Sequence, residues 1–462
     1  MNFKQKYSAL QDYFCKPMSR KALIWHLAVL LIAAVLLRIF SAIPALCDAQ
    51  TLLRPDSMGY WSPALALAAG EGFVSGIGST VPEVIRPIGY PAFLALSIKL
   101  FGRSLLAAAL MGIIFSASAV LPVFLGVRKA CSDRVGLLAG WLYAINMSCV
   151  AVAPLILSDS LLGVLAAWQF CMAVHLVKDK KLVFLAGFVL FAVAGALVKP
   201  VNLPVVLFGI PVILLGCWRN MQDFLTGIVI TIFIAGAVLL PYLSRNYRLC
   251  GDIDGNSANL FFHNGSAIMA HVTGESSEVW KNRLLQQAET EFKKHPQLYS
   301  SLREQNAWKK REFAALIKKY PKAALITHLP NIFNLLPDMP SFLENNHVTA
   351  GERGTMAVLR QKGFFAAVDH YLGGKFYIIF FLIPFFAVHA LILVFAFCEL
   401  VKYIKQWQWR WLLVFGVLVF YYILAPGPVV SPRYLLPALP MLIFMAVNFL
   451  YCKATVNNIS KG

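Results

Sequence analysis

Long apolar segments recur along this chain, and they limit it to one class of fold. Stretches of about 17 to 25 mostly apolar residues alternate with polar loops, and a helix of that length crosses a hydrocarbon core of roughly 30 Å. Only 14% of the 462 residues are charged and 59% are hydrophobic, whereas soluble domains carry roughly 25% charged residues. The sequence therefore predicts an all-α polytopic membrane protein.

About ten such segments can be counted. The first begins near Ala22. It is longer than the core of a secretion signal and no small-residue cleavage site follows it, so we interpret it as a retained span. Because several of the others are short, we expect a bundle of about 10–12 transmembrane helices. The expected spans lie near residues 22–43, 104–126, 135–150, 160–177, 182–198, 201–217, 224–243, 375–399, 411–424 and 434–451.

Basic residues are concentrated in alternate loops of this arrangement. Short cytoplasmic loops of membrane proteins are enriched in lysine and arginine, so the pattern predicts that both termini and these loops face the cytoplasm. It also explains the net charge of +19 without a nucleic-acid partner. We expect the protein to reside in a bacterial inner, or plasma, membrane. The basic loops lie at residues 4–21, 128–134, 178–181, 219, 402–410 and 453–461.

The opposite, outer face receives the remaining polar segments. The long segment 244–374 has apolar residues at three- and four-residue intervals, for example in "EVWKNRLLQQAETEFKKH", which is typical of helices. We therefore divide the chain into an N-terminal transmembrane module, 1–243, an extracytoplasmic and mainly helical segment, 244–374, and C-terminal transmembrane helices, 375–462. The other outer segments are loop 44–103 and the connections 151–159, 199–200 and 425–433.

Two acids and several cations stand on this outer face, at the ends of spans or beside prolines. Asp56 lies in "RPDSMGYW", with Tyr60 four residues later and therefore on the same face of a helix. Asp159 lies in "LSDSLLG", at the mouth of a span. The cysteines and histidines show no spacing typical of a metal site, so we assign no metal ligand. The cations are Arg86, Lys199, Arg245, Arg248 and Arg433.

Each of these residues alone has an ordinary explanation. Asp56 and Asp159 are good helix caps, the cations suit the headgroup level, and Tyr60 suits an interfacial aromatic belt. Together they suggest chemistry, because arginine binds phosphate through forked hydrogen bonds and a neighbouring acid can take a proton from an acceptor. The pattern favours transfer of a group from a lipid phosphate to a nucleophile outside the cytoplasm.

Several of these stretches resemble one family. "RPDSMGYWSPALALAAGEGF", followed by "RPIGYPAFLALSIKLFG", is similar to the first outer loop of the GT-C glycosyltransferases, in the branch of lipid A aminoarabinose transferase and the protein O-mannosyltransferases. "LSDSLLG", "GALVKPVNL", "PYLSRNYRLCGD" and "PRYLLPALP" follow in the expected order and extend the resemblance over most of residues 20–450.

The resemblance implies a GT-C-like bundle with outer amphipathic helices and a cavity at the outer membrane surface. It implies a polyprenyl-phosphate sugar as donor and a lipid, glycan or protein as acceptor. It also implies that Asp56 is catalytic, that Arg86 lies near the donor phosphate, and that Asp159 and Lys199 match the second acid and the basic residue of the family. Many relatives have Asp-Glu where this chain has Asp56-Ser57, which leaves divalent metal binding open.

We therefore expect an inverting glycosyltransferase in which Asp56 is the general base. Cations stabilise the leaving polyprenyl phosphate, with one or more of Arg245, Arg248 and Arg433 beside Arg86 and Lys199. A transporter or flippase for lipid-linked sugars is one alternative, although it favours polar residues near the bilayer midplane. A surface polysaccharide polymerase or ligase is another, and a structural envelope protein with Asp56 as a simple cap is a third.

Overall fold

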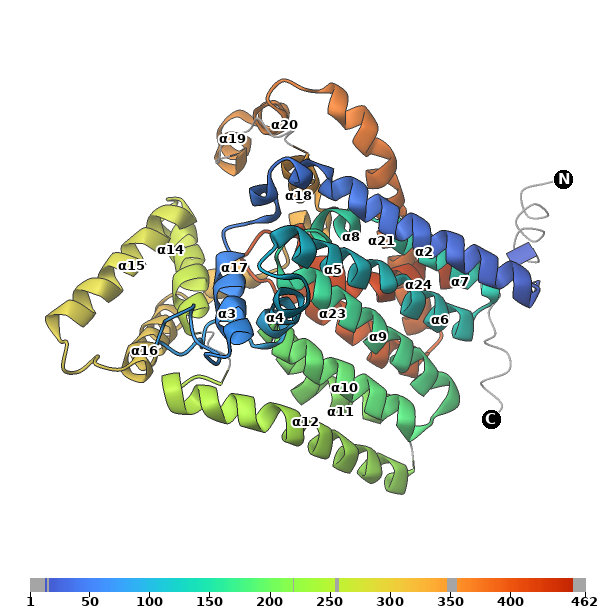
Figure 1. Ribbon diagram of the computed structural model, residues 1–462, viewed down its shortest axis with the longest axis horizontal. Coiled ribbons are helices and arrows are strands. Elements are labelled where there is room, and N and C mark those ends of the chain that lie inside the picture. Colours follow the sequence, from blue (N-terminus) through green and yellow to red (C-terminus); the bar gives the residue numbers. More distant parts are fainter. Residues whose placement is uncertain (1–12, 15, 219, 254–256, 347–354, 452–462) are drawn as a thin grey trace.

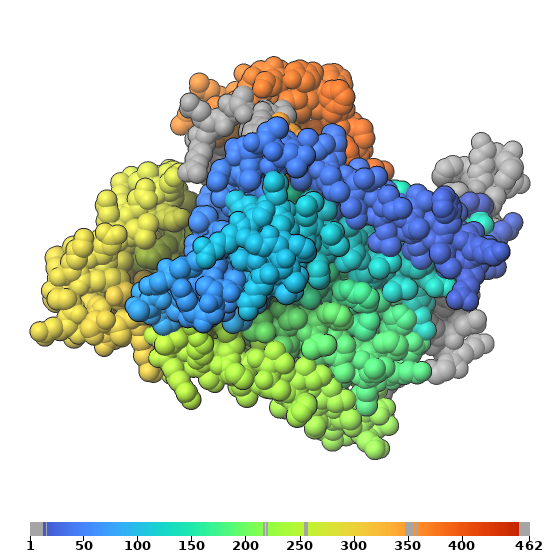
Figure 2. All heavy atoms as spheres, in the orientation of Figure 1, coloured from blue at the N-terminus to red at the C-terminus, as the bar shows by residue number. Residues whose placement is uncertain are grey.

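The computed structural model describes residues 13–14, 16–218, 220–253, 257–346 and 355–451. Within these residues the protein is built from helices, and the only β pairing is an isolated bridge between Val74 and Pro82. Most of the helices form a bundle, residues 265–319 form a lobe at one side of it, and the helices of residues 339–372 lie at another side, apart from that lobe (Figures 1 and 2). The prediction of an all-α membrane protein is thus confirmed.

Ten apolar helical segments support this class among the described residues. Six are long enough to cross a membrane, and four are shorter apolar helices of 10–17 residues. The shorter ones are Gly89–Phe101, Leu182–Val198, Pro200–Leu215 and Trp409–Leu424. The six long ones are Arg20–Leu46, Leu105–Ala130, Ser158–Asp179, Met221–Cys250, Tyr377–Lys405 and Pro432–Tyr451.

The helices fall into three groups along the chain. The N-terminal group is α2 (Arg20–Ala42), α3 (Met58–Ala69), α4 (Gly89–Phe101), α5 (Leu105–Ser118), α6 (Val120–Ala130), α7 (Asp133–Ala144), α8 (Met147–Val152), α9 (Ser158–Asp179), α10 (Leu182–Val198), α11 (Ile210–Cys217) and α12 (Met221–Cys250). The outer segment contains α13 (Ser257–Asn259), α14 (Gly265–Thr273), α15 (Ser277–Lys294), α16 (Leu302–Lys319), α17 (Pro321–His328), α18 (Met339–Asn345), α19 (Thr355–Lys362) and α20 (Phe364–Leu372). The C-terminal group is α21 (Tyr377–Lys405), α22 (Trp409–Trp411), α23 (Val417–Leu424), the 3₁₀ helix η8 (Pro432–Ala438) and α24 (Leu439–Tyr451).

Helix α9 lies in the middle of the bundle. Its side chains are mostly apolar on all sides, with Gln169 as a buried polar exception, which is the pattern of a helix buried all round. Phe170 is 1% exposed and Leu176 is fully buried, and α5, α6, α10 and η8 all contact the helix. By contrast, α12 runs along the outside of the bundle (Figure 1), with many of its apolar side chains exposed, as expected for a helix facing lipid.

The two ends of α9 differ in chemistry. At its C-terminal end, Asp179 pairs with Lys129 of α6 at 2.7 Å, and Lys178 lies over the ring of Trp411. We call this the basic end, because three of the predicted basic loops meet there. Asp159 lies at the other end of α9, which we call the polar end. The segregation agrees with the predicted two-sided topology, and the compartment that each end faces stays a prediction.

One expected span is wrong in detail. The segment 135–150 is not a single helix, because α7 ends at Ala144 and α8 begins at Met147. Asn146 caps α8 by accepting a hydrogen bond from the backbone N–H of Ser148 at 3.1 Å, the role that asparagine prefers. The fully buried Arg38 donates to the last carbonyl of α7, that of Ala144, at 3.3 Å and so satisfies a helix end inside the bundle.

The outer segment is tied to the polar end of the bundle through α18. The Asn345 side chain is 3% exposed and donates to the Ser41 hydroxyl at 3.2 Å and to the Ala151 carbonyl at 2.8 Å. Its oxygen accepts from Arg54 at 2.5 Å. One amide therefore joins α2, the end of α8, the first outer loop and α18. The predicted domain boundary at residue 243 falls inside α12.

Truncation of Asn345 should loosen this junction. Asn345→Ala leaves the buried partners of the amide without hydrogen bonds, so we expect the free energy of unfolding to fall by about 1–3 kcal/mol. Thermal unfolding in detergent, together with proteolysis of segment 330–346, measures the effect. Asn346→Ala is the matched control, since within the described part of the chain that amide bonds to nothing but the Phe342 carbonyl of the helix that Asn346 ends. Equal stability of the two variants would contradict the role of Asn345.

Gly89 allows α4 to lie against the end of α10. A Cβ built at Gly89 would lie 2.7 Å from the Leu197 carbonyl oxygen, which is backbone and cannot turn away. Gly89→Ala should therefore separate α4 from α10 and destabilise the fold by about 1–3 kcal/mol, as measured by thermal unfolding. Gly76→Ala in the same outer loop is the control, because its Cβ would make only an ordinary 3.6 Å contact with Ser62. A Gly89→Ala protein as stable as the control would show that the contact is not tight.

Candidate active site

Asp56 lies between two arginines. Ser57 is buried and precedes the first residue of α3, and its hydroxyl accepts from the backbone N–H of Arg54 at 2.8 Å, which closes the turn. The Asp56 carboxylate points away from this turn and accepts from Arg86 at 2.8 Å and from Arg433 at 3.3 Å. It therefore pairs with side chains and does not cap α3, so the capping interpretation is wrong for Asp56.

Asp159 is paired in the same way. It lies in the first turn of α9, where Leu157 occupies the N-cap position and no side-chain capping bond is made. One carboxylate oxygen is 2.5 Å from the Lys199 ammonium, and the other is 3.5 Å from Nε of Arg433. Asp159 is 5% exposed, so both charges of this pair depend on each other inside the fold. The capping interpretation is wrong here as well.

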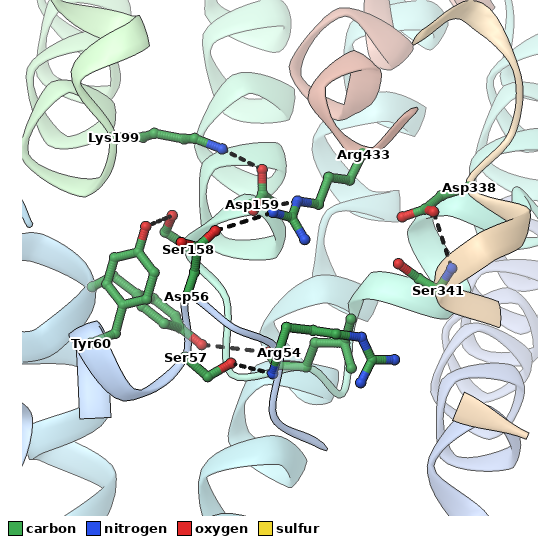
Figure 3. A network of polar contacts seen from close by, with 12 residues as sticks. Arg54, Asp56, Ser57, Tyr60, Ser158, Asp159, Lys199, Asp338, Ser341 and Arg433 are labelled. Atoms are coloured by element: carbon green, nitrogen blue, oxygen red, sulfur yellow. Dashed lines mark hydrogen bonds and ion pairs between the residues drawn. The ribbon is translucent and has the colours of Figure 1, made fainter. Parts of the chain in front are cut away.

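Arg433 joins the two acids. Its guanidinium contacts Asp56 from the first outer loop and Asp159 from α9, while Lys199 approaches Asp159 from the end of α10 (Figure 3). Four segments that are far apart in sequence thus bring together five predicted residues, which we call the acid–cation cluster: Asp56, Arg86, Asp159, Lys199 and Arg433.

Tyrosine rings support the cations of the cluster. Tyr60 is 5% exposed, its ring lies 4.8 Å from the Arg86 guanidinium, and its hydroxyl accepts from Ser158 at 3.1 Å. The ring of Tyr434 lies 4.2 Å from the Lys199 ammonium. A cation over an aromatic face is held electrostatically. Tyr434 and Ser158 were missed by sequence reasoning, although each is the immediate neighbour of a predicted site residue.

Two predicted cations are not brought to the cluster. Arg245 donates to the backbone carbonyls of Phe73 and Glu83, each at 2.9 Å, and so fastens the outer loop to α12. The Glu83 carboxylate in turn accepts from the backbone N–H of Arg86 at 2.9 Å, so Arg245 supports Arg86 indirectly. Arg248 is exposed on α12 and makes no contact with the cluster among the described residues.

A third acid that the sequence analysis did not select lies near the cluster. Asp338 begins α18 and is 2% exposed, and Arg433 and Asp159 act on it electrostatically. Arg54, on the same side, pairs with Glu344 of α18 at 3.0 Å. The sequence signal that could have identified Asp338 is "PDMP", in which an aspartate stands just before a proline-containing helix start.

The five residues of the acid–cation cluster comprise three cations and two acids, which gives them a net charge of +1 (3 − 2). Burial favours the neutral form of Asp56, but Arg86, Arg433 and Lys199 outweigh it and hold the pKa of the Asp56 carboxyl below its usual value. The Asp56 side chain is 42% exposed, so a ligand can reach an ionised carboxylate beside surplus positive charge. Such a site suits a phosphate next to a proton acceptor.

A metal ion has no prepared site among the described residues. No group of three or more His, Cys, Asp or Glu side chains is arranged to hold one there. Both carboxylates of the cluster are occupied by cationic side chains instead.

Several solved chains are similar in structure to this one. One is the archaeal oligosaccharyltransferase AglB from Archaeoglobus fulgidus in complex with an inhibitory peptide and a dolichol-phosphate, with 13% identity and a TM-score of 0.49 over 93% of this chain and 50% of that one. Another is ArnT from Cupriavidus metallidurans in the apo state, with 15% identity and a TM-score of 0.42 over 93% of this chain and 77% of that one. This chain spans half the length of the first.

Sequence comparison gives a family for the central part of the chain. No curated protein is significantly similar to it, but residues 85–243 match the model of the dolichyl-phosphate-mannose-protein mannosyltransferase family. This region contains Arg86, Asp159 and Lys199, three of the five residues of the acid–cation cluster. The match covers less than half of the chain, and it agrees with the family that the resemblance of the outer loops predicts.

Proposed function

We propose that this protein transfers a sugar from a polyprenyl-phosphate donor to an acceptor at the outer, non-cytoplasmic membrane surface. The observation that carries the proposal is the acid–cation cluster, in which an accessible carboxylate and surplus positive charge meet at the polar end of the bundle. A lipid-linked phosphate presents its charge at that depth. The family match over residues 85–243 supports sugar transfer as the chemistry.

The cations of the cluster provide the phosphate site. Arg86 and Arg433 offer forked donors, and Lys199 adds a point charge from the end of α10. When the bond between the anomeric carbon and the phosphate oxygen breaks, its electron pair stays on the phosphate. Fixed cations stabilise this growing charge without having to reorganise.

Asp56 is the proposed general base. It accepts a proton from the acceptor hydroxyl while the acceptor oxygen attacks the anomeric carbon opposite the leaving phosphate, which inverts that carbon. Without donor, Asp56 is occupied by Arg86 and Arg433. A phosphate competes for the same two guanidinium groups, so donor binding draws them away and makes the carboxylate more basic. The base then becomes effective only when a donor is present.

The position of the charged residues weighs against transport. A transporter concentrates its polar groups near the bilayer midplane, whereas Asp159 lies in the first turn of α9 and Lys199 just beyond the end of α10. A purely structural role as helix caps does not account for the two acids, because their carboxylates pair with side chains. A polysaccharide polymerase or ligase would use a lipid carrier at the same cations and differs in the sugar that it transfers.

Loss of the base should separate activity from folding. Asp56→Asn keeps the shape of the side chain but removes its proton affinity, so turnover of a polyprenyl-phosphate-linked sugar should fall by about 10²–10⁴-fold with little change in expression or thermal unfolding. Asp48→Asn is the control, because the Asp48 side chain caps a 3₁₀ helix in the same outer loop and asparagine caps as well as aspartate. Full transfer activity of Asp56→Asn would remove Asp56 from the mechanism.

The pH dependence of kcat/KM should change when the cationic partners of Asp56 are removed. A lowered pKa keeps Asp56 ionised down to and below the ordinary aspartate value of about 3.9, and the ionised form is lost only as pH falls through the folded value. Arg86→Gln removes the strongest of the lowering influences, so the acid limb of the kcat/KM profile should move to higher pH.

Arg248→Gln provides the comparison for this shift. It removes an exposed arginine of α12 that makes no contact with the cluster among the described residues, so its acid limb should match that of the wild type. An Arg86→Gln profile with an unmoved acid limb would mean that a group other than Asp56 sets it.

A further inference from the structure

Asp338 has one carboxylate oxygen that the fold does not use. The side chain is 2% exposed, and Oδ1 accepts from the backbone N–H of Ser341 at 3.2 Å. Oδ2 is buried and has no hydrogen-bond partner among the described residues. Its backbone is also fixed, because the N–H of Asp338 donates to the Ser148 hydroxyl of α8 at 2.8 Å. The free oxygen is therefore held in place, not left on a mobile chain.

The free oxygen lies on the cluster side of α18. In Figure 3 the Asp338 carboxylate points back toward Arg433, and Arg433 and Asp159 both act on it electrostatically. Arg433 is the residue that we place on the donor phosphate. A ligand group bound to the free oxygen of Asp338 would thus belong to the moiety that is linked to this phosphate.

Helix capping alone does not require this second oxygen. Capping uses one acceptor, and asparagine or serine supplies it as well as aspartate. A buried oxygen without a partner forfeits its hydration and is rare in folded proteins. A ligand that brings a hydrogen-bond donor would supply the missing partner. A phosphate would not, because it carries the same charge as a carboxylate.

Tyr371 of α20 provides a second unused polar group in the same neighbourhood. Its hydroxyl is buried without a hydrogen-bond partner among the described residues. Burial raises the pKa of the Tyr371 hydroxyl, and the charges of Glu344 and Asp338 raise it further. Tyr371 belongs to the same apolar cluster as Met339 and Leu343 of α18, the helix that Asp338 caps. A neutral hydroxyl next to a carboxylate offers both a donor and an acceptor to a polyol.

We propose that Asp338, assisted by Tyr371, binds hydroxyl or amino groups of the sugar carried by the donor while Arg433 holds its phosphate. This rests on the proposed function and names the part of the site that recognises the sugar. The outer segment then contributes directly to donor selection through α18 and α20.

Competition between two lipids tests this assignment. The purified full-length protein in nanodiscs is incubated with bare undecaprenyl phosphate mixed with a polyprenyl-phosphate lipid extract of the source cells, and bound lipids are measured by mass spectrometry. Wild type should enrich sugar-bearing lipids over the bare phosphate. Asp338→Asn retains the capping oxygen but replaces the free oxygen by a donor, so the enrichment should fall by about 10-fold or more, with uptake of the bare lipid unchanged.

Glu344→Gln is the matched control. It breaks the ion pair between α18 and Arg54 and leaves Asp338 intact, so it should keep the enrichment. If Asp338→Asn keeps the enrichment, or shows only a higher KM for the acceptor, the assignment to the donor sugar is wrong. Equal uptake of both lipids by wild type would overturn it as well. If wild type takes up neither lipid, the proposed function itself fails.

Discussion

The contact of Arg433 with two acids organises the polar end of this protein. Asp56 and Asp159 come from the first outer loop and from the central helix α9, and neither carboxylate caps the helix at which it stands. Cations from η8, from the loop before α4 and from the end of α10 compensate them. Because a buried charge without a partner is costly, loops that are distant in sequence are held together at this point.

If the cluster is the active site that we propose, this arrangement gives a physical reason for catalysis to depend on the donor. Without a ligand, the acids and cations satisfy each other, and Asp56 is a weak base. In the proposed mechanism, an incoming phosphate replaces carboxylate as the partner of the guanidinium groups, so the same event binds the donor and frees the base. During this proposed exchange Lys199 stays in place, because it pairs with Asp159, which is buried in the first turn of α9. In our proposal, Asp338 extends the site toward the sugar.

Composition and the spacing of apolar segments predicted the fold class and the approximate spans, because every segment that crosses lipid must satisfy its own backbone hydrogen bonds. The distribution of lysine and arginine predicted the segregation of basic and polar ends. Five of the eight predicted site residues meet in one cluster, and Tyr60 lies beneath Arg86. Local sequence signals predicted the wrong role where contacts with residues distant in sequence determine what a side chain binds. Asp56 and Asp159 have the sequence signature of caps, and Arg245 has that of a phosphate ligand, yet long-range contacts determine what each one binds. Asp338 was missed because the segment around it lacks helical periodicity.

A structure of the protein with bare undecaprenyl phosphate tests the central claim most directly. The phosphate oxygens should lie about 2.7–2.9 Å from donors of Arg86, Arg433 and Lys199, and Asp56 should have lost its contact with at least one arginine. A phosphate bound elsewhere, with Arg433 still joining Asp56 and Asp159, would contradict the proposed exchange of partners.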